Sequence, residues 1–335
     1  MSVLVTGATG FLGGYVVGRL IERTNEDVVC IVRGADPQAR LDAALAPLGV
    51  SGATAVAGDL SSDDLDVDMT GVTSIVHCAA DVRFDRSLEA ARAINVGGVR
   101  RLVELARRAP QLERFVHVST AYVGGTHVGR FHEADLDVGQ GFRNTYEQSK
   151  FEAEQLVRAS GLPVRVVRPS IVVGESTTGW TSSFNVLYPP LRALSRGLVA
   201  RVPADPQAIV DVVPVDHVAD VVLTALLFED AAETMHAVAS DGALRAADLA
   251  SAAAGVLGRP VPVLDPDDSD LPPGGLEIYA PYFTVRTRFD AARVRELGLS
   301  PRPLREYLPH LLSFAEEARW GKRILPRTGQ AIAIV

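Results

Sequence analysis

A short run near the start of the chain constrains its fold more than any other segment. Thr6-Gly7-Ala8-Thr9-Gly10-Phe11-Leu12-Gly13 joins an apolar run, 2–6, directly to a stretch in which apolar residues recur at helical spacing. Glycines there allow a tight turn and let the backbone approach a pyrophosphate, while the helix N-terminus offers N–H groups to its oxygens. The junction predicts a dinucleotide site, with candidate residues Gly7, Thr9, Gly10, Phe11, Leu12 and Gly13.

Apolar runs of strand length alternate with helical patterns through the first two thirds of the chain. Short continuous apolar runs separated by helices are typical of parallel strands that are buried on both faces. We therefore predict an α/β fold, a Rossmann-type doubly wound parallel sheet with helices on both faces. The runs are 2–6, 28–32, 53–57, 74–78, 115–119 and 164–167, and the helical stretches begin near Pro37, Ser87 and Thr145.

The alternation breaks after Ser170. Residues 175–197 are rich in Ser, Thr, Gly, Pro and aromatic residues, before a strand-like run returns at 209–213 and a helix is expected with Asp216 as its N-cap. We expect a smaller substrate-binding cap interleaved with the sheet. The expected nucleotide-binding domain spans 1–178 and about 209–240, the cap spans about 179–208 and 241–322, and 323–335 form a C-terminal tail.

The final helical pattern, around 303–320, has an apolar face. This face is typical of core packing or of a dimer contact, so a homodimer stays open. Its apolar residues are Leu304, Leu308, Leu311 and Leu312.

Composition excludes several classes of protein. The net charge of -8 argues against general nucleic-acid binding, which normally needs a basic face. No apolar run reaches the roughly 18 residues of a membrane span, and the N-terminus lacks the features of a signal peptide, which favours a cytoplasmic protein. Cys30 and Cys78 lie in apolar runs and are expected to be buried free thiols. His127, His132 and Glu133 match no metal-site spacing, so no metal is expected.

Further cofactor candidates follow the ends of the predicted strands. Arg33 ends the second apolar run, where a basic residue accommodates a 2'-phosphate and so favours NADPH over NADH; a solvated surface Arg33 is the alternative. Asp59 and Leu60 follow the third run, and Ala79 and Ala80 follow the fourth, at the same edge of the sheet. Asp59 is a candidate acceptor for the adenine amino group, or alternatively a turn cap.

Tyr146 and Lys150 lie four residues apart on a predicted helix, so both side chains occupy one face a single turn apart. A neighbouring ammonium and a positively charged nicotinamide favour the ionised phenol, which predicts a lowered pKa for Tyr146. Such a phenol can exchange a proton with a substrate near neutral pH. The pair therefore predicts general acid–base chemistry, and both residues are also candidate cofactor contacts.

Hydroxyl side chains end the fifth apolar run at the same sheet edge. Thr120 is the preferred donor to a substrate oxygen, and Ser119 is the competing choice. Asn95, inside a predicted helix, is a candidate for holding a water linked to Lys150 near the cofactor; a packing role is the alternative.

Together, the glycine run, Ser119 with Thr120, and Tyr146 with Lys150 resemble the extended short-chain dehydrogenase/reductases. Longer runs are similar to the thioester reductases and fatty acyl-CoA reductases, the male-sterility-type NAD-binding group, which release an acyl chain as an aldehyde. The resemblance covers about residues 3–230. Its runs are Val82-Arg83-Phe84, 94–99, 117–123, 149–154, Arg168-Pro169-Ser170 and 174–179.

This resemblance implies that Thr120, Tyr146 and Lys150 act as a triad and that Pro169, Ser170 and Ile171 border the nicotinamide. It implies NADPH-dependent reduction of an acyl thioester to an aldehyde, with reduction onward to the alcohol left open. No carrier segment precedes Met1, so a CoA- or carrier-bound donor is expected in trans. Alternatives are ketone or alcohol oxidoreduction on a sterol- or flavonoid-like substrate, sugar-nucleotide epimerisation, or a dinucleotide-sensing regulator without chemistry.

Overall fold

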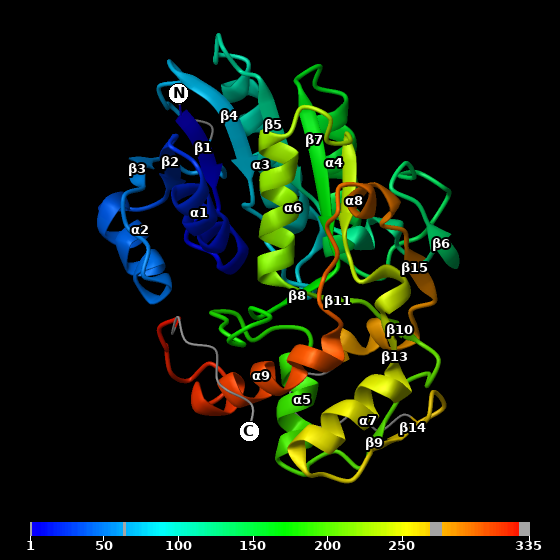
Figure 1. Ribbon diagram of the computed structural model, residues 1–335. Helices are drawn as coiled ribbons and strands as arrows, with labels where there is room; N and C mark the ends of the chain where they lie inside the picture. The colour runs from blue at the N-terminus through cyan, green and yellow to red at the C-terminus, as the bar shows by residue number, and fades with distance from the viewer. Residues whose placement is uncertain (1, 63–64, 269–276, 328–335) are drawn as a thin grey trace.

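The computed structural model describes residues 2–62, 65–268 and 277–327. Within these residues, one parallel sheet has the strand order β3-β2-β1-β4-β5-β7-β12 (Figure 1). The order reverses between β1 and β4, which is the switch point of a doubly wound sheet, so the predicted fold class is confirmed. The strands are β1 (Ser2–Thr6), β2 (Asp27–Val32), β3 (Thr54–Ala57), β4 (Val72–His77), β5 (Arg114–Val118), β7 (Val164–Pro169) and β12 (Thr234–Ala237).

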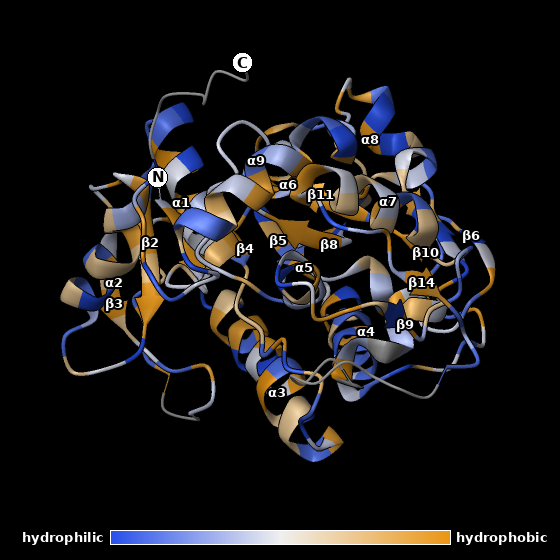
Figure 2. Ribbon diagram, turned by 90° about the horizontal axis from the view of Figure 1, so that it is seen from below, coloured by the Kyte–Doolittle hydropathy of each residue, from blue (hydrophilic) through white to orange (hydrophobic). Residues whose placement is uncertain are grey.

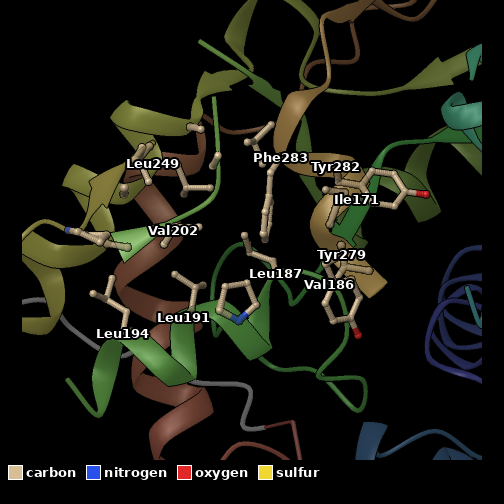
Figure 3. A pocket seen from close by; sticks show the side chains of 18 of the residues that line it. Ile171, Val186, Leu187, Leu191, Leu194, Val202, Leu249, Tyr279, Tyr282 and Phe283 are labelled. Atoms are coloured by element: carbon tan, nitrogen blue, oxygen red, sulfur yellow. The ribbon is translucent and has the colours of Figure 1, made fainter. Parts of the chain in front are cut away.

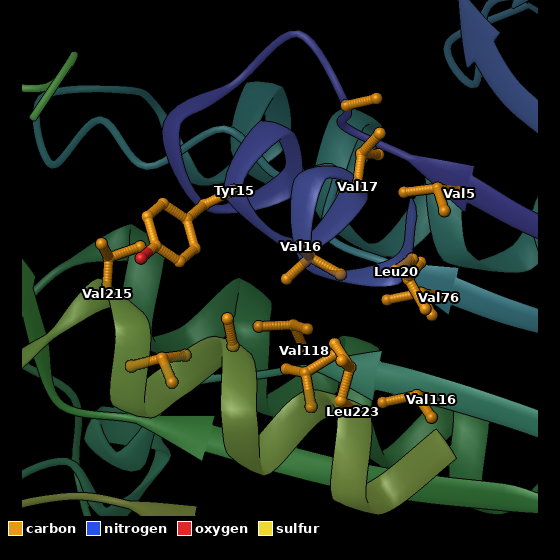
Figure 4. Close-up of a cluster of buried hydrophobic side chains, with 14 of the residues drawn as sticks. Val5, Tyr15, Val16, Val17, Leu20, Val76, Val116, Val118, Val215 and Leu223 are labelled. Atoms are coloured by element: carbon orange, nitrogen blue, oxygen red, sulfur yellow. The ribbon is translucent and has the colours of Figure 1, made fainter. Parts of the chain in front are cut away.

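Helices cover both faces of this sheet. Valines of β1, β4 and β5 pack against Val16 of α1 and Leu223 of α6 on one face (Figure 4), and α3 packs against α4 on the other. In Figure 2 the central strands appear as a hydrophobic layer between these helices. The helices are α1 (Phe11–Arg23), α2 (Pro37–Leu45) and α6 (Val215–Leu227) on the first face, and α3 (Leu88–Ala106) and α4 (Thr145–Arg158) on the second.

Side-chain caps fix the starts of the three helices predicted near Pro37, Ser87 and Thr145. Asp36, Ser87 and Asn144 each accept a backbone N–H from the first turn of their helix. The predicted cap at Asp216 is wrong. Helix α6 begins at Val215 with Pro214 at the N-cap position, and the Asp216 carboxylate accepts from the backbone N–H and hydroxyl of Ser176 instead.

A second core lies beyond the carboxyl ends of the sheet strands, where α5 (Tyr188–Ser195), α7 (Ala246–Leu257) and α9 (Leu304–Glu317) gather (Figure 1). The four leucines of the predicted terminal helix are all buried within this core. Their apolar face is therefore internal packing of one chain and not a dimer contact.

The chain enters and leaves this second region between strands of the main sheet. After β7 it forms β8 (Ile171–Val173) and α5, pairs β11 (Val212–Pro214) with β8, and returns through α6 to β12 beside β7. On this basis we propose that the nucleotide-binding domain and the substrate-binding cap are interleaved, with the boundaries expected from the sequence. The other short elements are η1 (Ala46–Leu48), η2 (Ala121–Gly124), β6 (Gly129–Phe131), β9 (Arg201–Val202), β10 (Ile209–Val210), η3 (Ser240–Gly242), β13 (Leu244–Arg245), β14 (Val263–Leu264), η4 (Glu277–Thr284), β15 (Thr287–Phe289) and α8 (Ala292–Glu296).

The described start of the C-terminal tail packs back onto the molecule. Trp180 Nε1 donates to the Leu325 carbonyl at 3.1 Å, and the Arg327 guanidinium pairs with Glu175 at 2.6 Å. Residues 328–335 of the expected tail lie outside the described residues. Within the described ranges, no helix is both long and apolar enough to cross a membrane.

Candidate active site

Two adjoining cavities open at the carboxyl edge of the sheet. The first, the nucleotide groove, encloses about 1270 Å³ and the second, the catalytic cavity, about 1640 Å³, each including space open to solvent. Predicted residues lining the nucleotide groove are Gly7, Thr9, Gly10, Arg33, Asp59, Leu60, Ala79 and Ala80. Predicted residues lining the catalytic cavity are Gly7, Gly10, Phe11, Leu12, Gly13, Ser119, Thr120, Tyr146, Lys150, Pro169, Ser170 and Ile171.

The turn between β1 and α1 packs against the end of β4 with no room for side chains. Gly7 has φ +77°, and a Cβ there would lie 2.6 Å from the Ala79 backbone nitrogen. A Cβ on Gly13 would lie 2.2 Å from the Gly7 carbonyl oxygen. Helix α1 begins without a side-chain cap at Gly10, so its first N–H groups face the groove without competition from a side-chain oxygen. This backbone surface fits the pyrophosphate of a dinucleotide.

Charged side chains lie at the outer end of the nucleotide groove. Arg33 is exposed directly after β2, and the Arg40 guanidinium donates to its carbonyl oxygen at 3.1 Å. Asp59 Oδ1 accepts from the backbone N–H and hydroxyl of Ser61 at 2.8 and 2.7 Å. Although burial opposes it, these bonds and the positive charges of Arg33 and Arg101 lower the pKa of Asp59. Asp59 thus caps a turn while also lining the groove.

Helix α4 presents Tyr146 and Lys150 from its first two turns. The Lys150 ammonium, which is 3% exposed, donates to the Val118 carbonyl at the end of β5 at 2.8 Å. The Tyr146 phenol is hydrogen-bonded to the Thr120 side chain, which follows the same strand. Both groups line the same cavity as the glycine turn, which is the arrangement that acid–base chemistry beside a nicotinamide requires.

The acid–base pair differs from the sequence-based expectation in one respect. Burial raises the pKa of Tyr146 to about 12, and the hydrogen bond to Thr120 only partly offsets this rise. The groups of the chain itself therefore do not lower this pKa, and lowering by a positively charged nicotinamide stays a prediction. Burial likewise lowers the pKa of Lys150 to about 8, against the opposing influence of Glu154 and Cys78. A buried ammonium held by a backbone carbonyl does not lower the pKa of the phenol one turn away.

Comparison with known proteins places this site in a family. The NAD-binding family model described as "Male sterility protein" matches residues 5–222, which is more than half of the chain. The chain belongs to this family.

Curated relatives of this family member include fatty acyl-CoA reductase 1 from Homo sapiens, which is 32% identical over 280 residues, 67% of this chain and 54% of that protein. Fatty acyl-CoA reductase 2 from Homo sapiens is 29% identical over 276 residues, 66% of this chain and 53% of that protein. The chain therefore spans about half the length of the curated relatives it matches.

Solved structures share the fold of this male sterility protein family member. The terminal R domain from the myxalamid PKS-NRPS biosynthetic pathway aligns with a TM-score of 0.81 at 23% identity, covering 95% of this chain and 91% of that one. A structure of MoeE5 in complex with UDP-glucose and NAD aligns with a TM-score of 0.70 at 22% identity, covering 95% and 100%. At these identities the likeness establishes the fold alone.

Asn95 takes a different position in this family member from the other cofactor candidates. Its Oδ1 accepts from the Asp81 backbone N–H at 2.8 Å, and its Nδ2 donates to the Asp81 carbonyl and to Ser149 Oγ at 3.0 and 2.9 Å. It is 3% exposed and is not among the residues lining either cavity. Asn95 therefore ties α3 to α4 and to the loop after β4, as the packing alternative expects, and its link to a water stays a prediction.

A buried ion pair beside the site escaped the sequence analysis. Glu154, one turn beyond Lys150 on α4, pairs with Arg168 of β7 at 2.7 Å, and both side chains are fully buried. Although burial alone would raise the pKa of Glu154, the charge and hydrogen bonds of Arg168 lower it on balance. The sequence did carry a signal for this pair. Arg168 directly follows the predicted strand 164–167, and Glu154 lies four residues after Lys150 on the predicted helix. The pair joins α4 to the strand that precedes Ser170.

The structure accounts for three further side chains that the sequence analysis names, those of Cys30, Cys78 and Glu133. Cys30 and Cys78 are free thiols, buried and half-buried, and burial raises the pKa of each to about 12. The Glu133 carboxylate accepts from the backbone N–H groups of His236 and Arg293 at 2.9 and 2.8 Å. Across the described parts of the chain, no group of three or more His, Cys, Asp or Glu side chains is placed to hold a metal ion.

Proposed function

We propose that this chain reduces an acyl thioester to an aldehyde, with NADPH as the reductant. The observation that carries the proposal is the single cavity in which Thr120, Tyr146 and Lys150 face the glycine turn between β1 and α1. The family match and the relatives named fatty acyl-CoA reductases support the thioester as the reacting group. The donor would be CoA or a carrier protein.

The nucleotide groove offers separate features for each part of the cofactor. The glycine turn and the N-terminus of α1 would hold the pyrophosphate. Arg33, with Arg40 beside it, would hold the 2'-phosphate that distinguishes NADPH from NADH. Pro169, Ser170 and Ile171 would border the nicotinamide, which when bound supplies the hydride for the carbonyl carbon.

The catalytic residues would act on the thioester oxygen. As that oxygen gains negative charge, the Thr120 hydroxyl and the Tyr146 phenol would donate hydrogen bonds to it, and Tyr146 would give it a proton. The buried Lys150 ammonium, with a pKa near 8, would return a proton toward Tyr146. The resulting hemithioacetal then breaks its C–S bond, so that the carbon leaves as aldehyde and the sulfur leaves as thiol with one proton.

The decisive experiment follows thiol release and NADPH absorbance together. The purified chain is assayed with acyl-CoA, acyl-carrier protein, a ketone and UDP-glucose, each with NADPH and with NADH. We expect free thiol to appear with NADPH consumption only for thioesters, one NADPH per thiol if the product is aldehyde and two if it is alcohol. NADPH consumption with the ketone and none with any thioester would contradict the proposal.

A further inference from the structure

A third cavity, the apolar chamber, lies in the cap between α5, α7 and η4. It encloses about 1020 Å³, including space open to solvent. Among the described residues that line it, every side chain is aliphatic or aromatic and none is charged. The polar side-chain atoms there are tyrosine hydroxyls, so a ligand with many hydrogen-bonding groups would leave those groups unsatisfied.

The apolar chamber and the catalytic cavity share a wall. Figure 3 shows one side of the chamber formed by residues of this wall and the other side formed by side chains of α5, α7 and β9. The two cavities are therefore neighbours across the side chains of this wall. The shared residues are Tyr122, Ile171, Val186, Tyr279 and Tyr282, and the labelled residues on the far side are Leu194, Val202 and Leu249.

Aromatic rings connect this wall to the catalytic helix. The Phe84 ring centroid lies 5.6 Å from that of Tyr146 and 5.2 Å from that of Tyr282, and the Tyr122 and Tyr282 rings meet edge to face at 5.1 Å. The Tyr282 hydroxyl accepts from Asn144 Nδ2 at 2.9 Å, and Asn144 caps α4. The shared wall is thus held in a fixed position relative to Tyr146.

We propose that the apolar chamber takes the far part of an unsubstituted aliphatic acyl chain and that its far wall, formed by α5 and α7, limits the length of that chain. The inference rests on the proposed function, because the thioester carbonyl must lie beside Tyr146 while the chain points into the cap. A hydrocarbon leaves no polar group without a partner in such a chamber, whereas a sugar or peptide would. Each buried methylene group contributes about fourfold to kcat/KM.

The first test is a series of CoA thioesters with NADPH. Butyryl, octanoyl, dodecanoyl and palmitoyl thioesters should show kcat/KM rising by about fourfold per methylene group until the chamber is full, and then no further rise. Dodecanedioyl-CoA, whose far end is a carboxylate, should react at least about a hundredfold less efficiently than dodecanoyl-CoA. The inference is overturned if kcat/KM does not change with acyl chain length, or if dodecanedioyl-CoA and dodecanoyl-CoA react with equal kcat/KM. No thiol release from any thioester would instead overturn the proposed function.

The second test changes the wall of the chamber. Ala250 lines it from α7, and Ala250→Phe should lower the dodecanoyl-to-butyryl ratio of kcat/KM by about fiftyfold, the loss of roughly three buried methylene groups. Ala247, on the same helix, is exposed and is not among the lining residues, so Ala247→Phe is the matched control and should keep the ratio within about twofold. Equal effects of the two variants would contradict the inference.

Enlarging the chamber tests the same wall from the opposite direction and does not depend on the folding of Ala250→Phe. Leu194 lies on the far side of the chamber, and Leu194→Ala should raise the palmitoyl-to-dodecanoyl ratio by about tenfold. An unchanged ratio in a variant that still reduces dodecanoyl-CoA would show that α5 does not limit the chain.

Discussion

The nucleotide groove and the apolar chamber each share lining residues with the catalytic cavity, yet they are built from different parts of the chain. The groove is lined by residues at the carboxyl ends of adjacent parallel strands, and the glycine turn beside it leaves no space for a Cβ on Gly7 or Gly13. The chamber is formed by side chains of segments as far apart as Tyr122 and Phe283. Backbone geometry should therefore make the groove intolerant of small changes, whereas the chamber should accept substitutions that keep its volume and apolar character.

The largest expected effect lies where the two regions meet. Tyr146→Phe should lower kcat by about a thousandfold, because it removes the proposed proton donor to the substrate oxygen, while NADPH affinity stays within about threefold. Single-turnover kinetics and fluorescence titration measure the two quantities.

Tyr307→Phe is the matched control for this change. Tyr307 is a fully buried tyrosine of α9 whose hydroxyl has no hydrogen-bond partner within the described structure, so its removal should leave kcat within about twofold. If Tyr146→Phe kept more than about a tenth of the wild-type kcat, another acid would have to supply the proton.

The second effect tests how strictly the backbone defines the groove. Gly13→Ala places a Cβ 2.2 Å from the Gly7 carbonyl oxygen, so the turn must shift, and we expect NADPH affinity to fall about a hundredfold. Gly255, an exposed residue of α7, is the control, since a Cβ there meets nothing within 4 Å. Gly255→Ala should raise the free energy of unfolding by about 0.5–1 kcal/mol without changing NADPH affinity. Similar losses of affinity in both variants would remove the contrast between the two regions.

The residues of the groove and of the catalytic cavity were predictable from the sequence because their determinants are local. The glycine turn lies within eight consecutive residues, Tyr146 and Lys150 are one helical turn apart, and three helix starts carry their own side-chain caps. Parallel strands then bring the ends of β1, β4 and β5 to one edge, which aligns residues that no local pattern connects.

The chamber and the electrostatics depend on contacts that no local pattern shows. Tyr282 meets Asn144 across 138 positions of sequence, so nothing around either residue predicts that contact. The pKa of Tyr146 depends mainly on how deeply the whole fold buries the phenol, which no pattern around Tyr146 shows. Asp216 resembles an N-cap in sequence but accepts hydrogen bonds from Ser176, forty positions earlier.

The third effect concerns Lys150, where a substitution should change the stability of the fold and the enzymatic activity in opposite directions. Lys150 is buried with its pKa lowered to about 8, so the folded chain holds an ammonium that burial disfavours. Lys150→Met should abolish most activity yet raise the free energy of unfolding at neutral pH by about 2 kcal/mol, after the lost hydrogen bond to Val118 is deducted. Chemical denaturation across pH measures this difference.

The pH dependence of this stability has a definite sign. Below pH 8 Lys150 is charged in both the folded and unfolded chains, so the cost of burying the charge is fully present. Between about pH 8 and 10.5 the folded chain releases the proton first, so wild-type stability gains from Lys150 as pH rises and the advantage of Lys150→Met shrinks. Lys322 is the other lysine of the chain and is exposed, so Lys322→Met should show neither effect. An advantage that is constant across this pH range would mean that improved packing, and not the buried charge, explains it.

The smallest effect concerns the exposed end of the groove, where side chains and not backbone would select the cofactor. Arg33→Ala should weaken NADPH binding about tenfold and leave NADH binding within about twofold, because a solvated arginine contributes one charged contact to a 2'-phosphate that NADH lacks. Arg100→Ala, at an exposed position of α3 that lines neither cavity, is the control and should change neither affinity. Equal weakening of both cofactors by Arg33→Ala would mean that this residue supports the shape of the groove. Selection of the phosphate would then fall to Arg40, whose guanidinium already holds the Arg33 carbonyl.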